Sequence, residues 1–343
     1  MAPTTAFQVH GRTAIVTGGS SGMGLCIARQ LAEKGANIVI VARDQAKLEK
    51  SVLHIKEGAL NPDIQRFHYI SADLTLSNEA VRVVDEVVAW NSGSPPDIIW
   101  TCAGSSHPTL FIDTPVSTFA SQMDTNYFTS LHMAHAVLRC WLLSPPGTTG
   151  TDPTGSATNP GNSLATRHLI FTASFLSFYT FAGYSPYSPC KAALRSLTDS
   201  LSQEMNLYAA ARPEETRVRV HAVFPSTILT EGYEAENRIK TDLTKHLEED
   251  DVPQTPEVIA SRSIRCLEAG QEIITTDIQT ALVRRGMLGG STRGGFLNGL
   301  VDWFLAGWVA IIMVLLRGDM DKKVRKWGRE FGTSGMKPKD GPV

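Results

Sequence analysis

The sequence predicts an α/β protein with a doubly wound, mostly parallel sheet that carries helices on both faces, followed by an apolar, membrane-associated helix near the C-terminal end. Three observations support this fold class. Apolar runs alternate with helix-period segments from residue 12 onward, a glycine-rich turn joins the first run to the first helix, and a nearly uncharged stretch lies close to the end. Sheets of this kind bind ligands at the carboxyl ends of their strands, where functional residues are therefore expected.

The alternation can be followed along the chain. Strands are expected where short runs of β-branched and apolar residues occur, at residues 14–16, 38–41, 67–70, 98–101, 169–173 and 218–223. Helices are expected where apolar residues recur at helical spacing, at residues 25–33, 44–56, 79–90, 117–142 and 191–211. Because helices separate the strands, neighbouring strands should run parallel.

Composition and charge exclude several classes of protein. With 343 residues, of which 42% are hydrophobic and 19% charged, the chain can bury a full core. A net charge of −2 gives no general reason for nucleic acid to bind, because that affinity needs many contacts from Lys and Arg to phosphates. The five cysteines form no C-x-x-C pair, which favours a reducing compartment and argues against a metal site. The first residues lack the pattern of a signal peptide, so the bulk of the chain is expected in the cytosol.

A segment rich in Gly, Pro, Ser and Thr interrupts the pattern at residues 144–167. Such a composition buries too little apolar surface to offset the entropy of ordering. We therefore expect a flexible insert between a helix end and the next strand, on the sheet edge opposite the active site. A docking loop is the alternative interpretation. The insert apart, residues 1–285 are expected to form one domain.

Residues 296–316 are apolar except for one charge, Asp302, and a basic tail follows at residues 317–343. About 20 mostly apolar residues are enough to span a bilayer core. Asp302 lies near one end of the stretch, where water or headgroups could reach it, and Trp303 and Trp308 suit a membrane interface. A buried core helix is the alternative. Membrane attachment is the favoured interpretation, and both spanning the bilayer and lying in one leaflet remain open.

The glycine-rich turn "TGGSSGMG" suits a phosphate-binding loop because it lies between a predicted strand and a predicted helix. Glycines there allow positive φ and let backbone N–H groups approach a pyrophosphate, to which the helix N-terminus adds partial positive charge. A tight turn without a ligand is the alternative. A P-loop is excluded because no Lys-Ser or Lys-Thr pair follows the glycines. The residues expected to contact the phosphates are Gly18, Ser20, Ser21, Gly22 and Gly24.

The stretch "TASFLSFYTFAGYSPYSPCK" combines residues that could reduce a ketone. Tyr187 and Lys191 are four positions apart, so on a helix their side chains share one face. A Lys ammonium beside a phenol should favour the phenolate and lower the pKa of Tyr187 from its usual value of about 10. Ser174 ends the preceding strand and could hydrogen-bond a carbonyl oxygen. An ordinary packed tyrosine beside an exposed lysine is the alternative interpretation.

Tyr184, in the same stretch, is the alternative candidate for the catalytic tyrosine. Its partner four positions later is Ser188, which cannot supply a charge, so Tyr187 is preferred. Pro186 and Pro189 would break a helix interior, and we therefore expect the helix to begin at Ser185, where the first-turn N–H groups are unpaired.

These motifs, in this order and spacing, resemble the short-chain dehydrogenase/reductase family. The resemblance implies a Rossmann-type fold, a nicotinamide cofactor, and a catalytic set that includes Asn126 in "MDTNYFTS", whose backbone would hold a water molecule of the proton relay. It also implies that Asp73 in "SADLT" lies on the adenine side of the cofactor.

The sequence departs from the family pattern at two positions. Cys102 in "TCAG" replaces the second Asn of the usual N-N-A-G stretch, which puts in doubt the role of that Asn in steadying the sheet. Ser226 follows Pro225 where the family usually has Gly on the nicotinamide side.

The residue after the second strand indicates which cofactor binds. An NAD-dependent enzyme usually has an acid here for the ribose 2′-hydroxyl, whereas a 2′-phosphate needs a cation. Arg43 occupies this position and can donate two hydrogen bonds to a phosphate, so NADPH is favoured, although Asp44 adjoins it. A solvated surface side chain is the alternative for Arg43.

The substrate is expected to be a lipid ketone, because an apolar anchor would let a cytosolic reductase collect its substrate from a bilayer. Residues 226–252 are charged and helical in pattern and should form a substrate lid. Within the family, the named stretches are most similar to reductases of a long-chain sphingoid ketone at the cytosolic face of the endoplasmic reticulum. A reductase of a steroid or fatty-acyl ketone and a non-catalytic NADPH-binding membrane scaffold are the alternatives. The family resemblance also makes a homo-oligomer possible.

Overall fold

The structure is a computed structural model that describes residues 6–143, 166–287, 289–292 and 294–337. Its core is one parallel sheet in the order β3-β2-β1-β4-β5-β6-β7. The strands are β1 Thr13–Thr17, β2 Asn37–Ala42, β3 Phe67–Ser71, β4 Ile98–Thr101, β5 Arg167–Thr172, β6 Val218–Phe224 and β7 Ile273–Thr275. The strand order reverses between β1 and β4, which is where open α/β sheets bind their ligands. The predicted fold class is confirmed.

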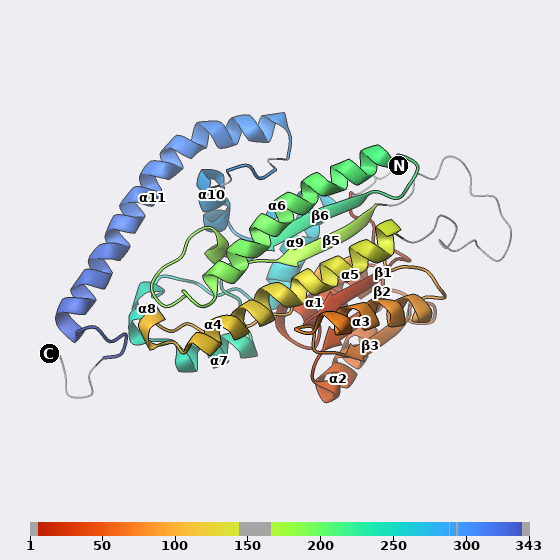
Figure 1. Ribbon diagram of the computed structural model, residues 1–343, viewed down its shortest axis with the longest axis horizontal. Helices are drawn as coiled ribbons and strands as arrows, with labels where there is room; N and C mark the ends of the chain where they lie inside the picture. Colours follow the sequence, from red (N-terminus) through yellow and green to blue (C-terminus); the bar gives the residue numbers. More distant parts are fainter. Residues whose placement is uncertain (1–5, 144–165, 288, 293, 338–343) are drawn as a thin grey trace.

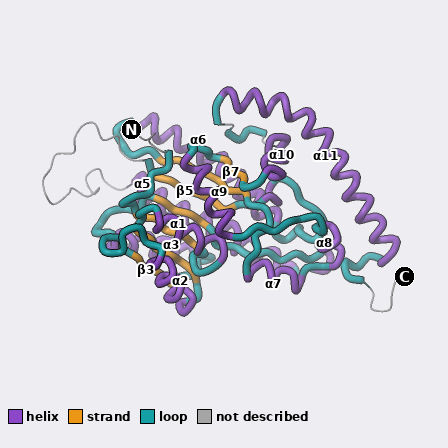
Figure 2. Tube along the Cα trace, turned by 180° about the vertical axis from the view of Figure 1, so that it is seen from behind, coloured by secondary structure: helices purple, strands orange, loops and turns teal. Residues whose placement is uncertain are grey.

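Helices cover both faces of the sheet because alternate strand residues point to opposite sides. Ile15 packs into the core beneath α3 (Ser77–Trp90), α5 (Thr129–Leu143) and α6 (Ser188–Ala211). Its neighbours Ala14 and Val16 pack into the core beneath α1 (Gly22–Glu33), α2 (Gln45–Glu57) and α9 (Pro256–Glu268). Figure 1 looks onto α5 and α6, and Figure 2 looks from behind onto α1 and α9.

Three local features differ from the sequence prediction. The helix expected at 117–142 is divided into α4 (Val116–Met123), a π-helical turn (Asp124–Phe128) and α5. Helix α6 begins at Ser188 and not at Ser185, because Tyr187 is its N-cap and Pro189 lies in its first turn. Strand β7 was not predicted, since it has only 3 residues.

The C-terminal part adds further helices besides α9. They are α7 (Glu231–Ile239), α8 (Asp242–Leu247), α10 (Ile278–Met287) and α11 (Phe296–Phe331). Helix α11 does not stop at residue 316 but continues to Phe331, so most of the expected basic tail is helical. In Figure 1 it runs along one side of the molecule from α10 to α8. The predicted insert, apart from its last two residues, lies outside the described residues, as does the end of the tail.

The sequence predicts that water or headgroups reach Asp302, and this prediction is wrong. Its side chain is fully buried and forms an ion pair with Arg285 of α10. The guanidinium offsets the cost of removing the carboxylate from water. The buried-helix alternative fails for most of the apolar stretch, because only 11% of the most apolar window of α11 is buried. By length and composition α11 is able to cross a membrane.

Candidate active site

The glycine-rich turn passes so close to other backbone that side chains do not fit. Gly18 has φ +65°, and a Cβ there would lie 2.9 Å from the backbone N of Ala103. A Cβ on Gly24 would lie 2.4 Å from the carbonyl oxygen of Gly18. Gly22 opens α1 with φ +52°. These glycines are therefore required by the tight path of the turn.

The turn also leaves donors at the start of α1. The N-cap, Ser21, makes no side-chain cap hydrogen bond, and the first N–H groups of a helix have no partners within it. A cavity lies at this end of the sheet, and its lining includes the predicted phosphate-site residues Gly18, Ser20, Ser21, Gly22 and Gly24. Backbone donors at a helix N-terminus fit a pyrophosphate. Gly19, which sequence reasoning missed, is needed for packing, since its Cβ would lie 2.6 Å from Ile40.

Arg43 and Asp73 lie at the ends of adjacent strands β2 and β3 and line the same cavity. Arg43 is exposed. The carboxylate of Asp73 accepts hydrogen bonds from the hydroxyl and backbone N–H of Thr75, which, with the nearby charge of Arg43, lower its pKa. Asp44 caps α2 by accepting from the N–H of Lys47 at 3.0 Å. The acid next to Arg43 is thus engaged at a helix N-terminus.

Cys102 is held by hydrogen bonds that join three strands. The hydroxyl oxygen of Thr17 accepts from the backbone N–H groups of Cys102 at 3.1 Å and Ala103 at 3.3 Å. The hydroxyl of Thr172 donates to the Cys102 sulfur at 3.3 Å and accepts from the indole of Trp100 at 3.2 Å. Burial raises the pKa of the Cys102 thiol to about 12. Threonines thus connect the strands at the position where the family usually has Asn.

Asn126 lies in the π-helical turn and is fully buried. Its side-chain oxygen accepts from the N–H of Ser105 at 3.1 Å, and its amide donates to the Ser105 carbonyl at 2.8 Å. A Cβ on Gly104 would lie 2.7 Å from that oxygen. The side chain therefore fixes the loop after β4. Nothing in the sequence periodicity signals the π turn that places it there.

Ser174, Tyr187 and Lys191 meet in the same cavity at the end of β5. The Ser174 hydroxyl oxygen accepts from the N–H of Leu176 at 3.2 Å. The Lys191 ammonium donates to the carbonyl of Thr172 at 2.9 Å and lies 5.6 Å from the centre of the Tyr187 ring. The structure thus brings the three predicted residues together, although Tyr187 stands at the N-cap position of α6 and not within the helix.

The pKa of Tyr187 differs from the prediction. Burial raises it, the charge of Glu236 adds to the rise, and the hydrogen bond with Ser174 opposes it. The net direction is therefore opposite to the one expected from Lys191, whose ammonium donates to the Thr172 carbonyl and is itself desolvated. Burial lowers the pKa of Lys191 to about 8.

Tyr184 belongs to a polar cluster that sequence reasoning missed. Its hydroxyl lies 2.7 Å from Glu236 and 2.6 Å from Glu248. The ammonium of Lys240 lies 3.1 Å from Glu236 and 2.6 Å from Glu248. The spacing of Glu236 and Lys240, four positions apart on a helix, was the available signal. Glu248 directly follows α8, the next helix, and could not be assigned to the cluster from sequence.

The predicted lid segment follows Pro225, whose carbonyl accepts from the N–H of Phe175 at 2.9 Å. Ser226 lines the cavity, and its hydroxyl accepts from Gln254 at 3.4 Å. The predicted charged lid corresponds to α7 and α8.

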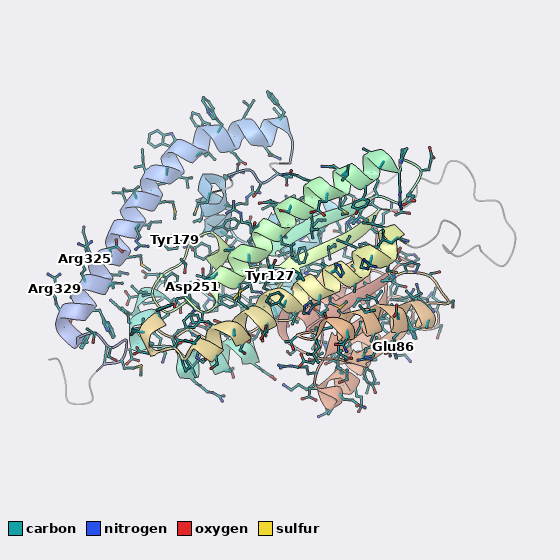
Figure 3. The ribbon with its side chains drawn as sticks, viewed as in Figure 1. Glu86, Tyr127, Tyr179, Asp251, Arg325 and Arg329 are labelled. Atoms are coloured by element: carbon teal, nitrogen blue, oxygen red, sulfur yellow. The ribbon has the colours of Figure 1, made fainter. Side chains whose placement is uncertain are left out.

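The cavity extends from the glycine-rich turn to α11 and has a volume of about 910 Å³. At the end opposite the turn it is lined by Met313, Leu316 and Met320 of α11. Tyr179 and Phe181, from the loop before α6, also line it. Figure 3 shows Tyr179 between α11 and α6. The cavity therefore has a polar end near the sheet, and α11 adds the three apolar side chains to its wall beside two charged ones, Asp319 and Lys323.

Comparison with known proteins agrees with this geometry. The short chain dehydrogenase family model matches residues 12–151 and 165–240. The 3-ketodihydrosphingosine reductase of Aspergillus fumigatus is 44% identical over 98% of this chain and 90% of its own length. The Neurospora crassa protein of the same name is 41% identical over 96% of this chain and 86% of its own.

Solved structures share the fold at low sequence identity. A short chain dehydrogenase/reductase from Burkholderia phymatum in complex with NAD has a TM-score of 0.64 at 16% identity, covering 82% of this chain and 94% of its own. A short-chain dehydrogenase from Sphingobium yanoikuyae in complex with NADPH has a TM-score of 0.61 at 18% identity, and the match covers 79% of this chain and 89% of its own. The chain belongs to the short-chain dehydrogenase family.

Proposed function

We propose that this protein is an NADPH-dependent oxidoreductase that reduces the ketone of 3-ketodihydrosphingosine to the alcohol of sphinganine, a step of sphingolipid biosynthesis. One observation carries the proposal: a single cavity is lined by Ser174, Tyr187 and Lys191 and also by apolar side chains of α11. A ketone with a long alkyl chain matches both ends of such a cavity. The names of the two fungal relatives support the same substrate.

The cofactor would lie along the carboxyl ends of β1 to β3. The glycine-rich turn and the start of α1 would hold the pyrophosphate, and Arg43 would bind the 2′-phosphate of NADPH. Asp44 does not oppose this assignment, because its carboxylate caps α2. NADPH, when bound, supplies the hydride that reduces the carbonyl carbon.

The side chains at the end of β5 would complete the reduction. Tyr187 would donate its phenolic proton to the carbonyl oxygen, and its raised pKa keeps that proton in place until an alkoxide develops. Ser174 would hydrogen-bond the same oxygen. Lys191 would hold the nicotinamide ribose and, in its charged form, stabilise the phenolate that remains.

Membrane attachment would occur through the apolar half of α11 at the endoplasmic reticulum, with the catalytic domain on the cytosolic side. Both ends of α11 contact that domain: Asp302 pairs with Arg285, and Trp327 packs against Leu243 and Leu247 of α8. A helix that crossed the bilayer would separate one end from the domain. The contacts therefore favour a helix that lies in one leaflet, with exposed side chains such as Phe304 and Trp308 in the lipid.

The test is the oxidation of NADPH by the detergent-solubilised full chain with 3-ketodihydrosphingosine. NADH replaces NADPH in one control, and a steroid ketone replaces the substrate in another. We expect turnover that is selective for NADPH and for the sphingoid ketone. Turnover of the steroid alone would refute the substrate, and binding of NADPH without turnover of either ketone would refute the enzymatic role.

A further inference from the structure

The cluster of Tyr184, Glu236, Lys240 and Glu248 lies beside the catalytic tyrosine. The rings of Tyr184 and Tyr187 are 6.3 Å apart, and Tyr184, Glu236 and Glu248 line the same cavity as Tyr187. Helix α7 supplies Glu236 and helix α8 is followed directly by Glu248. The cluster therefore belongs to the substrate end of the site, on the lid side.

The charges of this cluster do not cancel. Two carboxylates face one ammonium, that of Lys240, whose side chain is only 2% exposed. The Glu236 and Glu248 side chains are 15% and 16% exposed, so solvent screens them weakly. The cavity wall nearby adds the carboxylates of Asp250, Asp251 and Asp319 and one ammonium, that of Lys323, which pairs with Asp250. A cationic group entering this end of the cavity would meet a field that attracts it.

Glu236 retains capacity to accept hydrogen bonds. Both the Tyr184 hydroxyl and the Lys240 ammonium contact the same oxygen, Oε1. A carboxylate offers about four lone-pair positions on its two oxygens, so Oε2 can accept from a ligand without loss of the two contacts. An ammonium group, with three donors, is suited to that acceptor.

A carboxylate at this position also has a cost for the chemistry. The charge of Glu236 contributes to the raised pKa of Tyr187, which disfavours the phenolate that remains after proton donation. A cation brought by the substrate to the neighbourhood of the reacting carbonyl would offset that effect. In a 2-amino-3-ketone, the amine is on the carbon next to the carbonyl, which is where such a cation is needed.

We propose that Glu236, supported by Lys240 and Glu248, binds the protonated amine of the substrate and thereby selects 2-amino-3-ketones over ketones that lack the amine. This inference rests on the proposed function, because it names the part of that substrate which the lid recognises. Glu236 is thus a specificity-determining residue, and the alkyl chain extends from the reacting carbon toward Met313, Leu316 and Met320.

The experiment compares two ketones of equal chain length, 3-ketodihydrosphingosine and 1-hydroxyoctadecan-3-one, which lacks the amine. We measure kcat/KM for both with the wild-type full chain and with Glu236→Gln and Glu234→Gln. Glu234 is exposed on the same helix and serves as the matched control. Because a hydrogen bond to a charged group is worth about ten- to a hundredfold in affinity, Glu236→Gln should reduce the preference for the amino ketone by at least about tenfold. Glu234→Gln should keep it.

The outcomes separate the inference from the proposed function. If Glu236→Gln lowered kcat/KM equally for both ketones, Glu236 would have a structural role. This result would overturn the inference while the reductase assignment stands. A wild-type protein that turns over both ketones equally well would overturn it as well, and this result does not depend on the folding of any variant. Absence of turnover of the amino ketone by the wild type would overturn the proposed function and the inference together.

Discussion

The cofactor side of the cavity is formed by turns that end the strands β1 to β3, whereas the substrate side is formed by α7, α8 and α11, which lie outside the sheet (Figures 1 and 2). The first side is fixed by short-range sterics: a Cβ added to Gly24, for example, would lie only 2.4 Å from the carbonyl oxygen of Gly18. The second depends on ion pairs between distant residues, such as Arg285 with Asp302. The cofactor side should therefore tolerate loss of α11, and the substrate side should not.

Tyr187→Phe gives the largest expected effect. Removal of the proton donor should reduce kcat by roughly a thousandfold, because general acid catalysis typically contributes 10²- to 10⁴-fold. Binding of NADPH, measured by fluorescence titration, should be nearly unchanged, since the glycine-rich turn is intact. Near wild-type turnover would show that another group supplies the proton.

Arg285→Met tests the ionic contacts of the substrate side. It leaves Asp302 buried without this partner, which we expect to cost about 3–5 kcal/mol and to release the first half of α11 from α10. Limited proteolysis should then cut the chain near residue 290. The double variant Arg285→Met/Asp302→Leu should recover resistance to the protease. Equal cleavage of the single and the double variant would contradict a contact that depends on charge.

The sheet should lose stability in acid through a buried histidine pair. His168 Nδ1 lies 3.0 Å from His221 Nε2, and His221 Nδ1 lies 2.9 Å from the carbonyl of Gln271. Burial lowers the pKa of His221 from 6.5 to about 4, so the unfolded chain binds more protons below pH 6.5. The contribution of neutral His221 to the free energy of unfolding is therefore complete above pH 6.5 and is lost as the pH falls toward 4.

We expect this loss to be up to about 3 kcal/mol of unfolding free energy. Urea denaturation of the wild type and of His221→Gln between pH 7 and pH 4 measures it. The variant should be less stable at pH 7 and show a shallower decline. Parallel declines of the two proteins would contradict the assignment.

Arg43→Ala should have the smallest effect, confined to the cofactor side. Loss of a charged partner for the 2′-phosphate should raise the KM for NADPH about tenfold, while the KM for NADH changes little. Lys47→Ala, a nearby exposed cation on α2, is the control. Equal effects of Arg43→Ala on both cofactors would refute the 2′-phosphate assignment.

The same contrast explains what could be predicted from sequence. Strands β1 to β6 coincide with short apolar runs in the sequence. The glycine-rich turn and the Tyr187–Lys191 spacing are local patterns as well. The places of these features in the fold were therefore predictable. Strand β7 has only 3 residues, and its pairing with β6 decides its existence. The π turn at Asn126 has no periodic signature. Tyr184 contacts Glu236 and Glu248 across 52 and 64 positions of the chain, and Arg285 pairs with Asp302 from another helix, so no local pattern indicates these contacts.

The central claim is that one cavity joins a hydride-transfer site to an apolar wall that accepts a sphingoid chain. The most direct measurement follows deuterium from NADPH that carries deuterium at both C4 positions, with the full chain in lipid vesicles that contain 3-ketodihydrosphingosine. We expect sphinganine with one deuterium on C3, identified by mass spectrometry. Recovery of the unreduced ketone, or of sphinganine without the label, would contradict the account.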